Sequence, residues 1–228
     1  MERLKTIKID SRALTGIYFC DKEDSIKNIK DNTCYIDKNI TVPKGIVTVI
    51  DYINYMIRYL NIDIKDKKRK ISSLFKIIGF TNNYLDRDIV TLSSSELRLL
   101  QIITMLISKK EIVIINEPFE EFDLMNRKRI KTLIDKMVDK YDKIVIIITK
   151  NIDILYKYTK DLIIIKNDKV IKKGKTKDIL TNIDFLKENS IPVPESVSFI
   201  NLAKTTKKVK IDYNIDIRDI IKDIYKHV

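Results

Sequence analysis

The 228-residue sequence is long enough for one domain with a substantial core, or for one domain and a small appendage. Hydrophobic residues make up 44% and charged residues 33% of the chain. No apolar run approaches the roughly 18 residues that a membrane span needs, and no apolar stretch follows the first five residues. We therefore expect neither a membrane-spanning helix nor a secretory signal.

The formal net charge of +12 could indicate nucleic acid or an anionic membrane as a partner. Lysines and aspartates, however, alternate along the whole chain, which indicates a general composition bias and weakens that argument. The two cysteines, Cys20 and Cys34, have no metal-ligand company, because the only histidine is His227. We expect two reduced thiols.

The first 45 residues carry few signals, with expected strands at 14–19 and 33–37 and a polar stretch between them. Helical periodicity starts at Ile46 and predicts a helix over 46–60. A second helix is expected over 70–78, where Gly79 ends it.

A capping box, Ser93-x-x-Glu96, marks the next helix start, because each side chain can satisfy a backbone N–H of the first turn. This helix is apolar almost all round, so it should be buried. The unbroken apolar run 111–116 is typical of a central parallel strand that is covered on both faces.

The rest of the chain alternates between helices and strands. Helices are expected at 124–140 and 152–158, and strands at 143–149, 162–166 and 170–172, with Asn167-Asp168 as a hairpin turn. This order predicts an α/β fold with a largely parallel sheet. From residue 182 onward only three helical pieces are expected, around Phe185, Phe199 and Ile220.

Two segments carry the chemistry. The strand that ends in Asn116-Glu117-Pro118 places a carboxylate at the carboxyl end of a parallel sheet, where α/β folds bind ligands. The helix that starts after Ser93 offers free N–H groups and the positive end of a dipole, which suit a phosphate.

These two segments, and the distance between them in the sequence, resemble those of ATP-binding-cassette (ABC) ATPases. The family's signature, Leu-Ser-Gly-Gly-Gln, appears here as Leu92-Ser93-Ser94-Ser95-Glu96, and its Walker B strand, which usually closes in Asp-Glu-Pro, ends here in Asn116-Glu117-Pro118. The resemblance puts the D-loop aspartate at Asp123, the switch-histidine position at Lys150 and the Q-loop glutamine position near Lys38. It covers about residues 47–180 and implies a truncated P-loop NTPase-like ABC ATPase domain over 1–181, with a helical subdomain at about 46–108 and a helical appendage at 182–228.

A narrower similarity is to the ATPases of energy-coupling-factor (ECF) importers. It rests on Tyr84-Leu85-Asp86-Arg87, which precedes the signature, and on the tail from residue 184. In the family, the region of the 46–60 helix helps to receive the transmembrane subunit. The residues alone leave open whether its Tyr52, Tyr55, Met56 and Tyr59 do this or belong to the core.

The departures from the family pattern concern the phosphate loop. The four glycines, Gly16, Gly45, Gly79 and Gly174, contain no pair at Walker A spacing. Where the family would place this loop, the chain has the acidic stretch 20–25. Asn116 is a weaker magnesium ligand than aspartate, and Lys150 cannot act as an imidazole. Lys150 could instead be a solvated lysine, and Glu117, in the position of the catalytic base, could be idle.

The resemblance therefore implies a degenerate subunit that offers Ser93, Ser94, Ser95, Glu96 and Asp123 to a nucleotide bound by an intact homologous ATPase. ATP and Mg²⁺ would bind at most in such a composite site, with Lys38 and Lys150 as further nucleotide-binding candidates. The other expected partner is a transmembrane subunit at the inner face of the cell membrane. Two alternatives stay open: a scaffold or regulator that binds no nucleotide, and a basic protein associated with nucleic acid.

Overall fold

The computed structural model describes residues 9, 13–21, 33–62, 67–120, 122–207, 213 and 217–226. Most of the acidic stretch 20–25 and His227 therefore lie outside the described residues. Two compact units form, and each is described by itself. The middle unit contains residues 10–12 and 30–147, and the terminal unit contains residues 1–9, 13–29 and 148–228.

The middle unit combines helices with strands that lie in the order β2-β3-β4. Its elements are β2 (Thr33–Ile36), α1 (Val49–Tyr59), α2 (Lys67–Ile78), η3 (Asn82–Tyr84), η4 (Ile89–Thr91), α3 (Ser94–Leu106), β3 (Ile112–Asn116), α4 (Leu124–Asp139) and β4 (Ile144–Ile148), the last residue of which falls in the terminal unit. Strands β2 and β3 are parallel, with Thr33 opposite Ile112. Four of the five residues are buried in both β3 and β4, as expected for strands covered on both faces.

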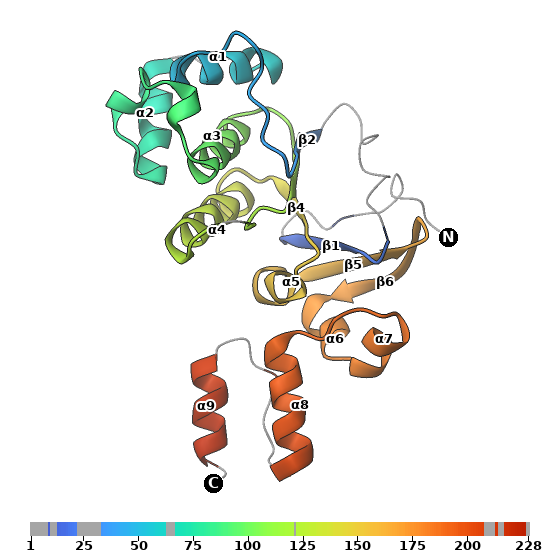
Figure 1. Cartoon of the computed structure of the whole chain (residues 1–228). Helices are drawn as coiled ribbons and strands as arrows, with labels where there is room; N and C mark the ends of the chain where they lie inside the picture. The colour runs from blue at the N-terminus through green and yellow to red at the C-terminus, as the bar shows by residue number, and fades with distance from the viewer. Residues whose placement is uncertain are drawn as a thin grey trace. The chain divides into compact units, whose positions relative to one another are not determined.

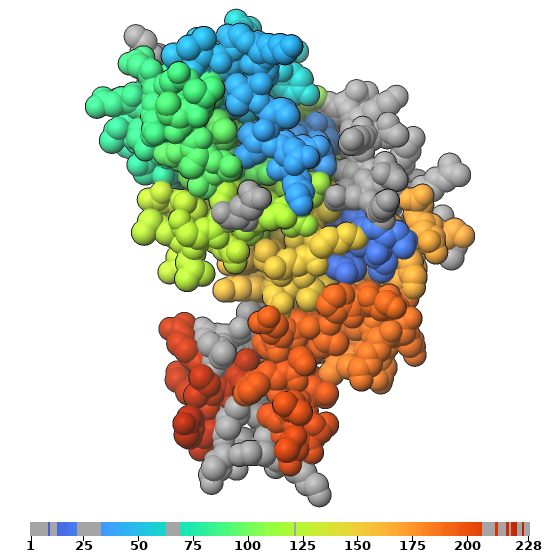
Figure 2. Space-filling view, in the orientation of Figure 1, coloured from blue at the N-terminus to red at the C-terminus, as the bar shows by residue number. Residues whose placement is uncertain are grey.

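Helices α1, α2 and α3 lie next to one another at the top of the view (Figure 2). The expected helix start at Ile46 was three residues early, because Thr48 caps α1 in a box with Asp51. Helix α2 ends as expected at Gly79, whose φ of +76° favours glycine. The α1 side chains that could belong either to the core or to a contact surface differ in burial. Tyr52 and Met56 are core residues, whereas Tyr59 is 70% exposed.

In its described residues, the terminal unit contains strands in the order β1-β5-β6 together with helices (Figure 1). Its elements are β1 (Thr15–Phe19), α5 (Ile152–Tyr158), β5 (Asp161–Lys166), β6 (Lys169–Lys175), α6 (Thr176–Leu180), α7 (Ile183–Glu188), α8 (Glu195–Lys207) and α9 (Ile217–Lys226). Strand β1 is parallel to β5, and β5 is antiparallel to β6. Asn167 and Asp168 both have left-handed φ angles, which confirms the predicted hairpin turn.

Gly16 lies in β1 and not in a loop. A Cβ atom at this position would come within 2.5 Å of Leu155 Cδ2 on α5, so the close approach of strand and helix needs a glycine. Helices α8 and α9 lie side by side and share a small cluster of Ile200 and Ile220 (Figure 1).

The α/β class with mostly parallel strand pairing is confirmed. Helix α6 and the two 3-10 turns were not anticipated, and β6 is longer than the expected strand at 170–172. The domain boundary at 181/182 and the helical subdomain over 46–108 stay predictions. Within the described residues, no helix has the length and apolar character needed to cross a bilayer.

Candidate functional site

The tip of helix α3 is built by the predicted capping box. Ser93 is the N-cap, and its hydroxyl accepts from the N–H of Glu96 at 3.3 Å. The Glu96 carboxylate accepts from the N–H of Ser93 at 2.8 Å and from its hydroxyl at 2.9 Å. Ser94 is exposed, and the hydroxyl of Ser95 lies 3.1 Å from that of Ser93. The start of the helix is therefore rigid and presents small polar side chains.

Glu96 is held from a second side. Tyr84 donates a hydrogen bond to its carboxylate at 3.1 Å, and Arg87 lies 3.5 Å from the same oxygen. Partial burial raises the pKa of Glu96, but the hydrogen bonds from Ser93 and Tyr84 and the charge of Arg87 outweigh it, so the pKa lies below the usual value. The carboxylate stays ionised at neutral pH and is turned toward its own helix start.

Asn116 and Glu117 lie at the carboxyl end of β3. Asn116 is 5% exposed, and its side-chain amide donates to the Tyr35 hydroxyl at 3.1 Å. Glu117 has a φ of +46°, an uncommon conformation for a residue other than glycine. A left-handed backbone fixed directly after a buried strand is typical of functional turns.

Asp123, the D-loop candidate, is the N-cap of α4. Its carboxylate accepts from the backbone N–H of Asn126 at 2.7 Å and from the side-chain amide of the same residue at 3.2 Å. The side chain thus has a clear local role in starting a helix.

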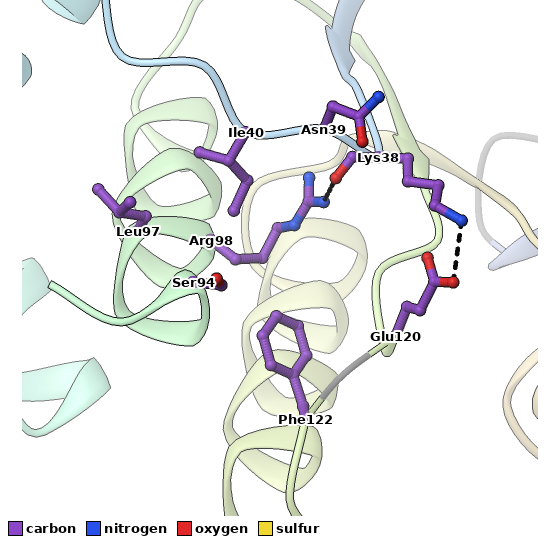
Figure 3. Close-up of a pocket in the computed structure, with 8 residues that line it drawn as sticks. All are labelled: Lys38, Asn39, Ile40, Ser94, Leu97, Arg98, Glu120 and Phe122. Atoms are coloured by element: carbon purple, nitrogen blue, oxygen red, sulfur yellow. Dashed lines mark hydrogen bonds and ion pairs between the residues drawn. The ribbon is translucent and has the colours of Figure 1, made fainter.

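Lys38, the Q-loop candidate, lies beside the α3 tip. Its ammonium group forms an ion pair of 2.9 Å with Glu120 (Figure 3). Both residues line a hollow of about 180 Å³, together with Ser94 and Arg98. The structure thus brings the Q-loop candidate and the signature helix to one small hollow.

Arg98 is the residue of this site that was missed from the sequence. It is 3% exposed, and its guanidinium donates to the carbonyl oxygen of Asp37 at 2.5 Å. It also donates to the carbonyl oxygen of Lys38 at 2.6 Å (Figure 3). Burial lowers the pKa of Arg98, although the nearby charge of Asp37 opposes this. An arginine among the apolar residues of a helix expected to be buried was the available signal, because a buried charge needs partners.

Lys150 lies in the terminal unit, two residues after β4. Its ammonium group donates to the carbonyl oxygens of Phe19 and Asp21, the latter at 2.7 Å. It also lies 5.6 Å from the centre of the Tyr18 ring. These contacts hold the side chain at the end of β1.

The tip of α3 and the end of β1 differ in how well their groups suit a bound nucleotide. The tip of α3 offers backbone N–H groups and hydroxyls, which suit phosphate. The end of β1 continues into Cys20 and Asp21, and the described residues there provide no glycine. Among the described residues, no group of three His, Cys, Asp or Glu side chains could hold a metal ion.

Comparisons with known proteins give relatives of one kind, although no family model matches the chain. The energy-coupling factor transporter ATP-binding protein EcfA2 of Mycoplasmopsis synoviae is 27% identical over 139 residues, which are 61% of this chain and 44% of the relative. EcfA2 of Mycoplasma mobile is 28% identical over 169 residues (74% and 54%). The probable ABC transporter ATP-binding protein p29 of Mesomycoplasma hyorhinis is 29% identical over 194 residues (79% and 77%).

Solved structures agree with this result. A chain of a metal-chelate type ABC transporter in an inward-facing conformation aligns with a TM-score of 0.61 and 14% identity, over 79% of each chain. A dimeric ATP-binding cassette bound to ADP and Pi aligns with a TM-score of 0.58 and 14% identity, over 75% of this chain and 88% of that one. The fold is that of an ABC ATPase domain.

The resemblance to ATP-binding proteins of ABC transporters is confirmed, and the curated relatives include proteins of the ECF type. The chain spans about half the length of the first two relatives.

Proposed function

We propose that this chain is a degenerate ABC ATP-binding subunit of an ECF-like importer, and that it presents the tip of α3 to a nucleotide bound by an intact partner ATPase. The observation that carries the proposal is the complete capping box at Ser93 and Glu96, in which the helix start faces outward with exposed serines. The names of the relatives support the transporter context.

The chain's own nucleotide half is the weaker one. None of its four glycines lies in the stretch that follows β1, so the sequence there lacks the residue type whose backbone wraps phosphates. Asn116 offers a neutral side chain at the expected magnesium position and donates its amide to Tyr35. These features favour binding of Mg-ATP through a partner over binding by this chain alone.

In a composite site, the roles would fall to the α3 tip. The hydroxyl of Ser93 and the first N–H groups of α3 would face the γ-phosphate, and Asp123 would act from the start of α4. The partner would supply the phosphate loop and the magnesium ligands. Glu117 would then be an idle remnant, since a general base needs a bound triphosphate to act on.

The helical part of the middle unit offers a surface for a transmembrane subunit. Val47 is 59% and Val90 is 80% exposed, and a backbone hydrogen bond of 2.8 Å from Ile89 to Val47 holds their segments together. Contiguous exposed apolar patches mark interaction surfaces, and we propose that Val47 and Val90 belong to one. Such contact would place the chain at the inner face of the cell membrane.

The test is to purify the tagged chain with its associated proteins and to measure ATP hydrolysis by the complex. We expect an intact ABC ATPase and a membrane protein to co-purify. Ser93→Arg should lower hydrolysis by about 10²-fold or more without releasing the partners, because it blocks the helix tip. Ser73→Arg, at an exposed serine of α2, is the matched control and should have no effect.

Two results would contradict the proposal. Unchanged hydrolysis in Ser93→Arg would favour a scaffold that binds no nucleotide. Ser94 and Ser95, which replace the family's glycines, are compatible with that role. Salt-dependent binding of duplex DNA without any ATPase partner would favour the nucleic-acid alternative.

A further inference from the structure

Lys150 holds the end of β1 and the two residues that follow it, Cys20 and Asp21. The lysine is exposed along part of its length, yet its ammonium group donates to two carbonyl oxygens, those of Phe19 and Asp21. The Tyr18 ring lies beside the same ammonium group, with its centre 5.6 Å away. One side chain thus contacts three of the four residues from Tyr18 to Asp21.

Two further hydrogen bonds fix the same segment within the terminal unit. The N–H of Cys20 donates to the carbonyl of Ile165 on β5 at 2.8 Å, which continues the pairing of β1 with β5. The N–H of Asn167, in the β5–β6 turn, donates to the Asp21 carboxylate at 2.6 Å. Phe19, Cys20 and Asp21 each therefore have a fixed partner from another part of the unit.

The polarity of this network is the reverse of a phosphate site. Phosphate binding needs backbone N–H groups that converge on the anion. At the end of β1, carbonyl oxygens instead converge on a cation, and the Cys20 N–H is already bound to β5. Two of the three N–H donors of this ammonium group are directed at carbonyl oxygens, which leaves at most one for an anion.

We infer that Lys150 is a positioning residue that fastens the described end of β1, from Tyr18 to Asp21. The fastening itself is independent of any partner, whereas what it means for nucleotide binding rests on the proposed function. Lys150 then acts as an internal tie and does not contact nucleotide.

The experiment compares Lys150→Met with Lys177→Met in the isolated chain, without nucleotide. Methionine keeps the length of the side chain but removes its charge and its donors. Lys177, an exposed lysine on α6, is the matched control. Backbone amide exchange, read by mass spectrometry, reports on the segment 18–21, and labelling of the half-buried Cys20 thiol is a second readout, with the buried Cys34 as internal reference.

We expect Lys150→Met to speed exchange in segment 18–21 and labelling of Cys20 by about fivefold, since a charge-assisted hydrogen bond at a partly exposed site contributes modestly. Peptides from α3 and labelling of Cys34 should not change, and Lys177→Met should match the wild type. In Lys150→Arg, the guanidinium can donate to both carbonyls, so exchange should stay as slow as in the wild type. Equal rates in Lys150→Met and the wild type would overturn the inference.

A measurement on the unmodified chain covers the case in which Lys150→Met fails to fold. Under limiting acetylation, Lys150 should react at least about fivefold more slowly than Lys177, because its side-chain nitrogen must first leave the two carbonyl oxygens to which it donates. Equal reactivity, or protection of Lys150 by added Mg-ATP, would overturn the inference. None of these readouts needs the partner ATPase, so a failed complex assay would leave them unaffected.

Discussion

The tip of helix α3 and the end of strand β1 both carry polar groups, but these groups point to different kinds of partner. At the tip of α3, the side chains of Ser93 and Glu96 satisfy each other's backbone N–H groups and leave the helix start facing outward. At the end of β1, the carbonyls of Phe19 and Asp21 turn to the ammonium group of Lys150.

Under the proposed function, this difference would explain how one chain keeps half of a nucleotide site. A helix start needs only its caps to remain a phosphate-binding surface, and those caps also stabilise the fold. A phosphate loop needs several glycines with unusual backbone angles, and the structure gains nothing from them without a ligand. We expect the first kind of surface to persist when the second is lost.

The largest effect is expected from Arg98→Met, which removes the anchor between α3 and the segment at 37–38. Two carbonyl oxygens would lose a buried charged donor, so the free energy of unfolding should fall by about 2–4 kcal/mol in urea titrations. Arg58→Met, at an exposed arginine of α1, should change it by less than about 0.5 kcal/mol. A loss below about 1 kcal/mol in Arg98→Met would show that the anchor is not structural.

An intermediate effect is expected from Ser93→Ala. Loss of the N-cap should lower the free energy of unfolding by about 1 kcal/mol, because the N–H of Glu96 loses its acceptor. Thermal unfolding followed by circular dichroism measures the change. Ser73→Ala, in the middle of α2, should leave the melting temperature almost unchanged, and equal shifts in both variants would contradict the assigned role of the cap.

The smallest effect is expected from Glu96→Gln, which restores the family's glutamine. The folded-state pKa of Glu96 is depressed, so its contribution to stability is fully present above the unfolded value of 4.5 and is lost as pH falls through the folded-state pKa. The variant should be less stable by about 0.5 kcal/mol at pH 7 and should match the wild type in strong acid.

Urea titrations over a range of pH provide the measurement for Glu96→Gln. Glu188→Gln, at an exposed residue near the end of α7, serves as the control for a surface carboxylate. A difference between Glu96→Gln and the wild type that does not change with pH would show that the charge of Glu96 is irrelevant to the cap.

Local sequence rules predicted the elements that depend on local chemistry. The capping box at Ser93, the buried run of β3 and the two-residue turn at Asn167 are each determined by a few neighbouring residues, and all three are confirmed. Helix α6 was missed because its five residues, Thr176–Leu180, are too short to show a helical period.

The site residues that sequence reasoning could not place depend on distant partners. Arg98 binds carbonyls about 60 residues away, and Lys150 binds carbonyls about 130 residues away. Backbone carbonyls have no sequence signature, so neither contact can be recognised before the chain is folded. The assignments of Lys38 and Asp123 to nucleotide binding stay predictions.

The central claim is that this chain offers a helix tip to a triphosphate but cannot hold one by itself. Isothermal titration of the isolated chain with Mg-ATP tests it most directly. We expect no binding, or binding only at millimolar concentration, and tighter binding once the co-purified ATPase is present. Micromolar binding with turnover by the isolated chain would contradict the account.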